Sequence, residues 1–254
     1  MDLKPTDFLG SLAKGLAVIE AFSGERPRLS IAEVAAVTGL DRATSRRCLL
    51  TLSRLGYADY DGKFFRLTPR VLRLGTACLA TMPLPTIVQP MLDTLSGETG
   101  QSSSVSILDD WEIVYVARAA QQRVMSISLA PGSRLPAYCT SMGRVLLASL
   151  PEAEARGILR RHKPEHRTPR TVTDPDAIMA IIAKVRSQGY AINDQEIELG
   201  LRSIAVPLFD ARGRTVAALN IGVAAAIHDT AERLREAYLG KLIAVQQNLR
   251  PLLS

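Results

Sequence analysis

The stretch Leu29–Tyr57, LSIAEVAAVTGLDRATSRRCLLTLSRLGY, decides how the rest of the chain is interpreted. Ser30 and Glu33 have the spacing of a capping box, in which the hydroxyl accepts from the N3 amide and the carboxylate accepts from the cap amide. A helix is therefore expected to begin directly after Ser30. Gly39 suits the left-handed conformation that ends a helix, and Asp41 can cap a second one. Two helices joined by a tight turn containing Gly predict a helix-turn-helix.

The second of these helices carries both apolar and basic side chains. Cys48, Leu52 and Leu55 stand at i, i+4 and i+7 and are expected to face a core, which leaves the polar side chains mostly on other faces. An α-helix fits the major groove of DNA, where guanidinium groups pair with guanine edges or phosphates and hydroxyl groups bond to either. The residues expected to contact DNA are Ser30, Arg42, Thr44, Ser45, Arg46, Arg47, Lys63 and Arg66.

Two short aromatic-rich runs follow the helices, on either side of Asp61-Gly62. Asp-Gly is a strong signal for a type I′ hairpin, which would place Lys63 and Arg66 on a small wing. An ordinary three-helix packing motif with a solvated basic face is the competing interpretation. The winged helix-turn-helix is favoured because cap, turn, basic helix and hairpin occur together in the right order.

Charge and composition bound the class of protein. Eight Lys or Arg side chains lie between Arg42 and Arg73 against two Asp, so this region alone accounts for the net charge of +6 of the 254-residue chain. Such a concentration of positive charge indicates a surface that faces a polyanion.

The three cysteines are widely spaced, which favours a reducing compartment and no zinc cluster. No apolar run approaches the roughly 18 residues of a membrane span, and the first residues lack a signal-peptide pattern. We therefore expect a cytoplasmic protein.

Helices are expected on both sides of the helix-turn-helix. Leu9, Leu12, Leu16 and Ile19 recur at helical spacing and predict an amphipathic helix over residues 8–22 that covers its core. After the wing, a helical run opens at Thr68-Pro69 and is broken by the prolines of residues 82–85 (MPLP). A helix followed by prolines is a plausible spacer between domains. Its leucines could pack on a second subunit or back onto their own domain, and the sequence leaves both open.

The remainder of the chain predicts a sheet with helices, an α+β sensor-like domain. A helix is expected from Ile87 to Gly97, and Asp229 with Glu232 is expected to cap the last helix. β-Branched and alternating patterns predict strands over 101–108, 111–119, 123–130, 203–209 and 215–223. Further helices are expected over 142–150, 152–161 and 174–189, the last with Asp174 as its cap and Pro175 at its first position.

Three places in this second domain combine loop geometry with polar side chains. One is the helix start at Tyr138-Cys139-Thr140-Ser141, where amides and the helix dipole would accept a carboxylate. The second is the acidic cluster around Asp194, and the third is the strand pair that holds Ser203 and Asn220. Together they would suit a small polar or aromatic acid, with Met142 and Tyr138 as apolar wall. Each place alone is better explained by capping or surface solvation.

The sequence lacks the residue patterns that are typical of catalytic sites. His162 and His166 are four apart, but Pro164 between them disfavours the helix that would bring both to one metal. There is no G-x-S-x-G, no Gly-rich phosphate loop and no paired-cysteine spacing in the sequence. We therefore expect no catalytic residue, no bound metal and no cofactor.

The helix-turn-helix and five further segments resemble the IclR family of bacterial transcriptional regulators, in particular the branch that controls aromatic-acid (β-ketoadipate pathway) catabolism. The resemblance covers nearly the whole chain, and its motifs occur in the family's order. The segments are LAKGLAVIEAF (12–22), GKFFRLTPRVLRLG (62–75), SRLPAYCTSMGRVLLASL (133–150), DQEIELGLRSIAVPL (194–208) and GRTVAALNIGV (213–223).

The resemblance implies a winged helix-turn-helix over residues 1–68, a linker helix over 69–86 and a GAF-like effector-binding domain over 87–254. It implies a homodimer or homotetramer that binds a double-stranded DNA operator and a small carboxylated effector. A second domain that only oligomerises, without a ligand, is the alternative. One departure is Gly222, where relatives of this branch often carry a hydroxyl residue. The implied recognition helix is Arg42–Leu55, and the expected effector-site residues are Tyr138, Ser141, Met142, Asp194, Ser203 and Asn220.

Overall fold

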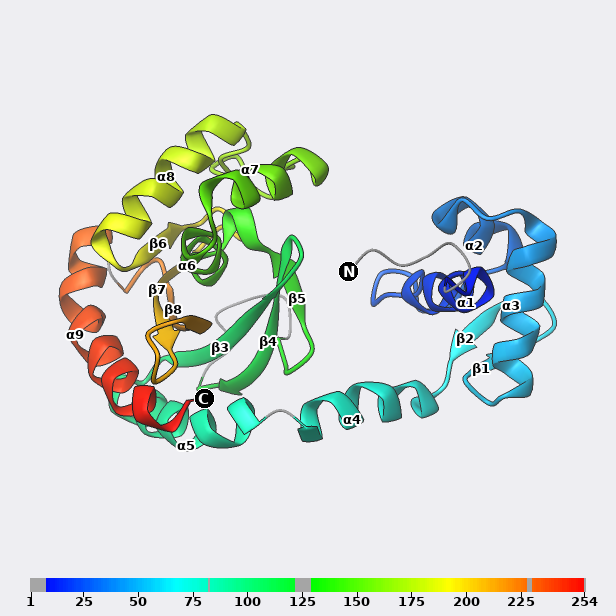
Figure 1. Ribbon diagram of the computed structural model, residues 1–254, viewed down its shortest axis with the longest axis horizontal. Helices are drawn as coiled ribbons and strands as arrows, with labels where there is room; N and C mark the ends of the chain where they lie inside the picture. Colours follow the sequence, from blue (N-terminus) through cyan, green and yellow to red (C-terminus); the bar gives the residue numbers. More distant parts are fainter. Residues whose placement is uncertain (1–7, 82, 122–128, 228–229, 254) are drawn as a thin grey trace. The chain divides into compact units, whose positions relative to one another are not determined.

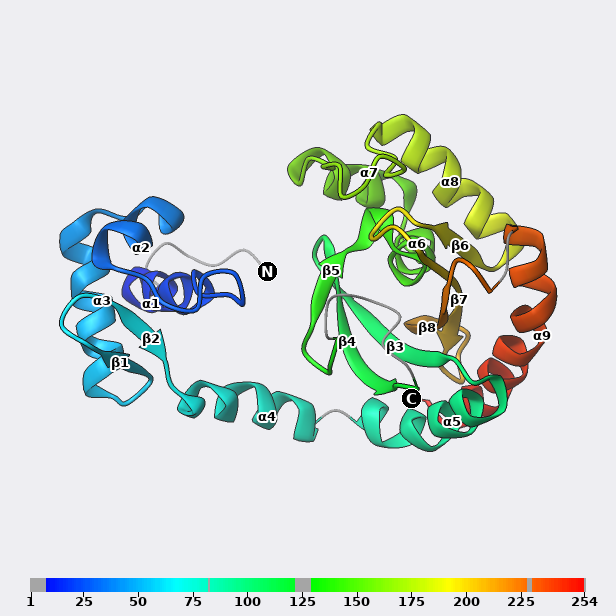
Figure 2. The same ribbon diagram turned by 180° about the vertical axis from the view of Figure 1, so that it is seen from behind.

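The computed structural model describes residues 8–81, 83–121, 129–227 and 230–253, with side chains of residues 76–80 left undescribed. The chain forms two compact units, Met1–Thr81 and Met82–Ser254. Figures 1 and 2 show their helices and strands from opposite sides. No helix among the described residues is long and apolar enough to cross a membrane.

The first unit is a winged helix-turn-helix, as predicted. Ser30 and Glu33 form both bonds of the capping box, Gly39 ends α2 with φ 69°, and Asp41 accepts from the Thr44 amide to start α3. A two-stranded antiparallel hairpin follows. The elements are α1 (Gly10–Glu20), α2 (Ile31–Thr38), α3 (Arg42–Arg54), β1 (Ala58–Tyr60) and β2 (Phe65–Leu67).

The core of this unit uses a different face of α3 from the expected one. Ser45, Leu49 and Leu52 are buried, whereas Cys48 is half-buried and Leu55 is 53 % exposed. Both sets have helical i, i+4, i+7 spacing and share Leu52, so spacing alone could not choose between them. The predicted set was therefore wrong in its phase along the helix.

Helix α1 also differs from the expected arrangement. Val18 is fully buried, but Leu12 is 59 % exposed and Leu9 and Leu16 are exposed as well. Ile19 alone of the predicted stripe packs against the core. Leu9, Leu12 and Leu16 thus remain at the surface, and the prediction that they cover the core was wrong.

The wing turns through four residues instead of the two-residue turn that Asp-Gly predicts. Tyr60 pairs with Phe65, which leaves residues 61–64 as the loop. The carboxylate of Asp61 accepts from the amides of Lys63 and Phe64, and Gly62 has φ 101°. The Asp61 amide also donates to the Phe64 carbonyl at 3.1 Å, so backbone and side chain close the loop together.

Two helices lie where a linker helix and a proline break were expected. A 3₁₀ turn over Pro69–Val71 leads into α4 (Leu72–Thr81), and α5 already begins at Pro83 and runs to Thr99. Helix α4 ends directly before residues 82–85, where a break was expected, but the expectation that the next helix starts only at Ile87 was wrong. Prolines are tolerated in the first turn of a helix because those amides have no partner within it.

A six-stranded sheet forms the centre of the second unit, and every pairing in it is antiparallel. The strand order is β5-β4-β3-β8-β7-β6. Helices cover both faces in Figure 1, so the domain is α+β as predicted. The strands are β3 (Ser102–Asp109), β4 (Glu112–Ala119), β5 (Arg134–Pro136), β6 (Ala191–Asp194), β7 (Leu201–Phe209) and β8 (Thr215–Ala224).

The two faces of the sheet carry different side chains. In β8, Leu219, Ile221 and Val223 pack into one apolar core with α5 and with α9 (Ala231–Leu249). The alternate residues Asn220 and Gly222 point to the other face, because successive side chains of a strand alternate. That second face is covered by α6 (Ser141–Ser149) and α8 (Pro175–Gln188), with α7 (Glu152–Arg161) beside them.

Several local predictions for this unit need correction. Arg134–Pro136 forms a short strand where a loop was expected, since it pairs with the edge of β4. Thr230, not Asp229, is the cap of α9 and accepts from the Arg233 amide. The strand expected over 123–130 falls largely outside the described residues. The predicted starts of α6, α7 and α8 agree with the structure, including Asp174 and Pro175 at the start of α8.

Candidate functional site

Helix α3 presents three arginines to solvent. Arg42, Arg46 and Arg47 are exposed, while Leu49 and Leu52 of the same helix are buried in the core. On the wing, Lys63 and Arg66 are exposed in the hairpin that follows the helix. These five cations form what we call the basic surface.

Three hydroxyl residues expected at DNA have other roles. Ser45 is fully buried and cannot reach a groove, so its assignment to the DNA face was wrong. Thr44 is buried and donates to Asp41 at the start of α3. The hydroxyl of Ser30 is engaged with Glu33 in the capping box. The hydroxyl groups of Ser30 and Thr44 therefore hold the starts of the two helices, whereas that of Ser45 is buried without a hydrogen-bond partner among the described residues.

The acidic side chains near the basic surface accept hydrogen bonds from backbone amides. Side-chain and backbone hydrogen bonds from Thr44 hold the pKa of Asp41 below its ordinary value. Backbone hydrogen bonds from Phe64 and Lys63 lower the pKa of Asp61 in the same way. Within the described part of the first unit, no cation of the basic surface forms an ion pair. The positive charge therefore stays available to a polyanion.

Arg28 extends the basic surface and was missed in the sequence. Its guanidinium lies 5.0 Å from the centre of the Phe64 ring, and the Lys63 ammonium lies at the same distance. Two cations on one aromatic ring fix the loop before α2 against the wing. The run of basic residues just before Ser30 was the available signal, but its contact with the wing is tertiary.

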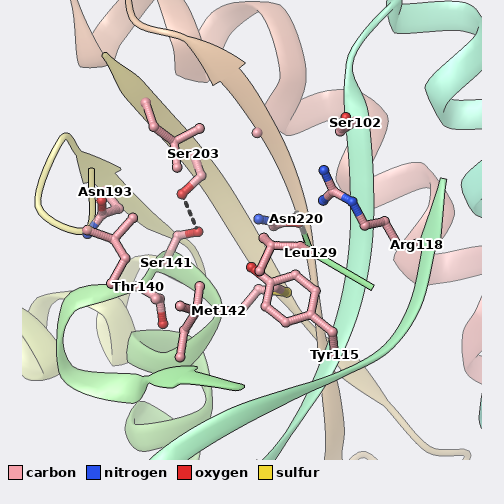
Figure 3. A pocket seen from close by; sticks show the side chains of 14 residues that line it. Ser102, Tyr115, Arg118, Leu129, Thr140, Ser141, Met142, Asn193, Ser203 and Asn220 are labelled. Atoms are coloured by element: carbon pink, nitrogen blue, oxygen red, sulfur yellow. Dashed lines mark hydrogen bonds between the residues drawn. The ribbon is translucent and has the colours of Figure 1, made fainter. Parts of the chain in front are cut away.

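The second candidate site is a cavity between the sheet and α6, shown in Figure 3. About 30 Å³ of it is open to the centre of a water molecule. A water needs roughly 10–15 Å³ by this measure, so the cavity holds about two waters as it stands. Its apolar wall consists of Tyr115, Leu129, Leu135, Met142, Ile197 and Leu201. A ring-sized ligand therefore has to push this wall outward.

The polar groups of the cavity lie on the sheet, in a row across four strands. Arg118 of β4 is paired with Ser104 of β3, and Ser104 with Asn220 of β8. Ser203 of β7 is paired with Gly222, two residues beyond Asn220 on the same face. The small side chains of this row leave the space above the sheet open. In Figure 3, Asn220 lies between Arg118 and Ser203.

Helix α6 forms the other side of the cavity at Ser141 and Met142. The hydroxyl groups of Ser141 and Ser203 are 2.8 Å apart and hydrogen-bonded. Met142 accepts from Ser106 through its sulfur, and Thr140 caps the helix through the Gly143 amide. A Cβ on Gly143 would lie 2.2 Å from the carbonyl oxygen of Ala137. The start of α6 can approach the preceding turn this closely only with glycine at that position.

Two polar groups in the cavity are incompletely paired. The Oδ1 atom of Asn220 is buried and has no hydrogen-bond partner among the described residues. Arg118 is half-buried and donates to the Ser104 hydroxyl at 2.9 Å, and burial lowers its pKa from the ordinary value. The sequence signal for Arg118 was a charged residue well inside a strand whose only other charge, Glu112, stands at its first position.

Four expected effector-site residues line the cavity and two do not. Ser141, Met142, Ser203 and Asn220 are brought together as predicted. Asp194 instead forms ion pairs with Arg202 and Arg170, outside the cavity. Its pKa lies below the ordinary value, because hydrogen bonds from Arg202 and Gln195 outweigh the opposing effect of burial.

Tyr138, the other exception, points away from the cavity. Its hydroxyl donates to the Glu165 carbonyl and accepts from the Glu165 amide. The prediction that Tyr138 forms an apolar wall of the site is therefore wrong. Next to it, burial raises the pKa of the Cys139 thiol to about 12, so this cysteine stays protonated at neutral pH. Among the described residues there is no group of three or more His, Cys, Asp or Glu that could hold a metal ion.

A buried ion pair connects α6 to the segment next to the cavity wall at Ile197. Arg144 of α6 donates to both carboxylate oxygens of Glu196, at 2.5 and 2.8 Å, and to the Tyr138 carbonyl. Glu196 also accepts from the Val172 amide. The segment that carries Ile197 into the cavity is thereby tied to α6.

Comparison with known proteins places these two sites in a family. The chain is 45 % identical over 244 residues to the Pca regulon regulatory protein of Pseudomonas putida, which covers 96 % of this chain and 84 % of that protein. A regulator from Rhodococcus sp. RHA1 has a crystal structure with 46 % identity and a TM-score of 0.76, over 95 % of this chain and 97 % of that one.

The inducer-binding domain of Acinetobacter PobR, solved as a double mutant with 3-hydroxybenzoic acid, matches the chain with a TM-score of 0.62 and 32 % identity. That match covers 66 % of this chain and 98 % of the PobR domain. Residues 11–62 match the family model described as the IclR helix-turn-helix domain, and residues 76–249 match the one described as Bacterial transcriptional regulator IclR C-terminal. The chain belongs to the IclR family of bacterial transcriptional regulators.

Proposed function

We propose that this protein binds an operator through the basic surface and changes its affinity for that DNA when a small carboxylate enters the cavity. One observation carries the proposal: an uncompensated basic helix-turn-helix and a buried cavity with a polar floor occur in separate units of one chain. Major-groove recognition needs exposed cations on a helix, and Arg42, Arg46 and Arg47 supply them. Action on the operator places the protein in the cytoplasm.

The class of effector is proposed from the relatives and from the chemistry of the cavity. The PobR domain was solved with 3-hydroxybenzoic acid, and the Pseudomonas relative is named for the Pca regulon. The cavity combines apolar wall with hydroxyl, amide and guanidinium groups, which is the composition of a site for a small polar organic acid. We therefore propose a carboxylate of aromatic catabolism as the effector.

We further propose that the protein acts as a homodimer or homotetramer. A single helix-turn-helix covers one half-site, so a dimer is needed to bind an inverted repeat or closely related paired sites. Leu72 and Leu74 of α4 are exposed in the single chain and are available for such an interface.

Two measurements test this function. DNA from upstream of the neighbouring genes is titrated with protein, with and without 3-hydroxybenzoate, by fluorescence anisotropy. Thermal unfolding is followed with the same compound, which at about 100 times its dissociation constant should stabilise the protein by roughly 2.7 kcal/mol. A second unit that only oligomerises predicts no ligand-dependent shift with any member of a panel of aromatic carboxylates.

A further inference from the structure

The three arginines in the first two turns of α3 differ in how their side chains are held. The Nη2 atom of Arg47 donates to the hydroxyl oxygen of Thr44 at 3.3 Å, and that hydroxyl donates to Asp41 at 2.7 Å. Arg42 and Arg46 have no side-chain hydrogen bond or ion pair within the described part of the chain. Of the three guanidinium groups, only that of Arg47 is therefore held in place before DNA binds.

The first turn of α3 fixes both partners of Arg47. Asp41 is the N-cap, and its carboxylate accepts from the amide and from the hydroxyl of Thr44. These bonds lower the pKa of Asp41, and the positive charge of Arg47 adds to the effect. Thr44 is 7 % exposed and β-branched, so its side chain has little freedom to rotate. The guanidinium is thus bonded to a hydroxyl of fixed orientation that is itself bonded to an ionised carboxylate.

Helix geometry places Arg47 at the centre of the exposed face of α3. Residues two apart in an α-helix point about 200° apart, which is to nearly opposite sides. Ser45 and Leu49 flank Arg47 at this spacing, and both are fully buried. Arg46, one position after Ser45, and Arg42, three positions before it, are turned toward the flanks of the exposed face.

A fixed guanidinium and a free one suit different parts of DNA. Bidentate pairing with guanine needs two N–H donors aimed at the O6 and N7 acceptors in one geometry, whereas a phosphate can be neutralised from many directions. A side chain that is held before binding also loses less rotamer entropy on contact. The bond to Thr44 uses one of the five N–H donors of Arg47 and leaves four for a base.

We propose that Arg47 is the specificity-determining residue of α3 and reads a guanine, that Thr44 is its positioning residue, and that Arg42 and Arg46 contact phosphates. This inference rests on the proposed function and specifies how the chain recognises its operator. It separates Arg46 from Arg47, which are adjacent in the sequence and could not be told apart there. It also gives Thr44 an effect on DNA recognition that is exerted through Arg47, without a contact of its own.

The test is fluorescence anisotropy on the full-length protein with two DNA duplexes of equal length. One carries the site that the wild type selects from a random-sequence library, and the other carries the same bases in scrambled order. The ratio of the two dissociation constants measures sequence discrimination, and the dependence of affinity on salt measures the phosphates contacted. In a further set of duplexes, 7-deazaguanine replaces each guanine of the selected site in turn, which removes only the N7 acceptor.

The variants are Arg47→Gln, Arg46→Gln, Thr44→Val and Thr44→Ser. Thr51→Val is the matched control, because the Thr51 hydroxyl also donates to Arg47, at 2.8 Å, but to its main-chain carbonyl. Thermal melting of each variant without DNA verifies that it is folded.

We expect Arg47→Gln to lower the discrimination ratio roughly tenfold to a hundredfold, the range for a lost bidentate contact to a base. At one guanine, 7-deazaguanine should weaken binding of the wild type and leave that of Arg47→Gln unchanged. Arg46→Gln should weaken both duplexes by the same factor and reduce the salt slope by about one. Thr44→Val should lower the ratio about threefold to tenfold at an unchanged salt slope. Thr44→Ser should recover most of this loss, and Thr51→Val should discriminate like the wild type.

Other outcomes overturn the inference. Equal weakening of both duplexes by Arg47→Gln makes Arg47 a phosphate contact, and a ratio that falls only in Arg46→Gln exchanges the two roles. If no guanine of the selected site responds to 7-deazaguanine, or if every response persists in Arg47→Gln, Arg47 does not read guanine. A wild-type ratio in Thr44→Val removes the positioning role of Thr44.

The same titrations separate this inference from the proposed function. If the wild type selects no sequence and binds both duplexes equally, operator recognition fails together with the role of Arg47. Discrimination by the wild type that does not depend on Arg47 refutes the inference and leaves the proposed function standing.

Discussion

Removing one partner of the buried Arg144–Glu196 pair should destabilise the second unit severely. The side chains are 2 % and 10 % exposed, so Glu196→Gln leaves the Arg144 charge buried without a counter-charge. Loss of one member of a buried pair costs about 3–5 kcal/mol. For a unit of this size each kcal/mol lowers the melting temperature by about 2–4 °C, so the expected drop is roughly 6–20 °C.

Calorimetric unfolding of the full-length protein measures this effect. The control is Asp176→Asn, which breaks the surface pair with Arg156 and should cost only about 0–1 kcal/mol because Asp176 is 82 % exposed. The double variant Arg144→Met/Glu196→Leu replaces both charges with apolar groups and should regain most of the stability. A drop for Glu196→Gln no larger than that of the control would refute the reasoning.

Three further predictions concern DNA, packing and pH. Arg46→Ala or Arg47→Ala should weaken operator binding by about 1–3 kcal/mol at unchanged melting temperature, measured by gel shift, and unchanged affinity in both variants would remove α3 as the reading helix. Gly143→Ala should destabilise the second unit, because its Cβ would lie 2.2 Å from the Ala137 oxygen; a melting temperature equal to that of the wild type would contradict the close contact. The pKa of Asp194 lies below 3.8, so its contribution to stability is complete above that pH and is lost as the pH falls through the folded-state value. Urea unfolding of the wild type and Asp194→Asn should therefore differ at neutral pH and converge in acid, and a difference that persists in acid would speak against the ion pairs as its source.

The features that the sequence predicts correctly depend on neighbours within a few residues. The capping box at Ser30 and Glu33 and the cap at Asp174 have both partners in one helical turn, so the spacing alone identifies them. The phase of α3 depends on which face meets α1, and Leu52 belongs to both possible stripes. Such a choice is made by tertiary packing.

In the candidate ligand site, too, some residues were predicted from the sequence, whereas others depend on tertiary contacts. Ser203 and Asn220 were expected on one strand pair, and the family resemblance named both as effector-site residues; both line the cavity. The roles of Asp194 and Arg118 could not be separated, since both are charged residues in strands. Asp194 has a partner in Arg202 on the neighbouring strand, whereas the isolation of Arg118 becomes visible only once every carboxylate has been placed.

Strand β3 gives the cavity and helix α5 a shared boundary one strand thick. Ser102 lines the cavity, and the adjacent Ser103 donates to the Leu92 carbonyl in α5 at 3.0 Å. A ligand that pushes the cavity wall outward therefore bears on the same backbone that holds this helix. Helix α5 directly follows α4 along the chain. A displacement of β3 would therefore move α5, and the N-terminal end of α5 would pass this movement to α4.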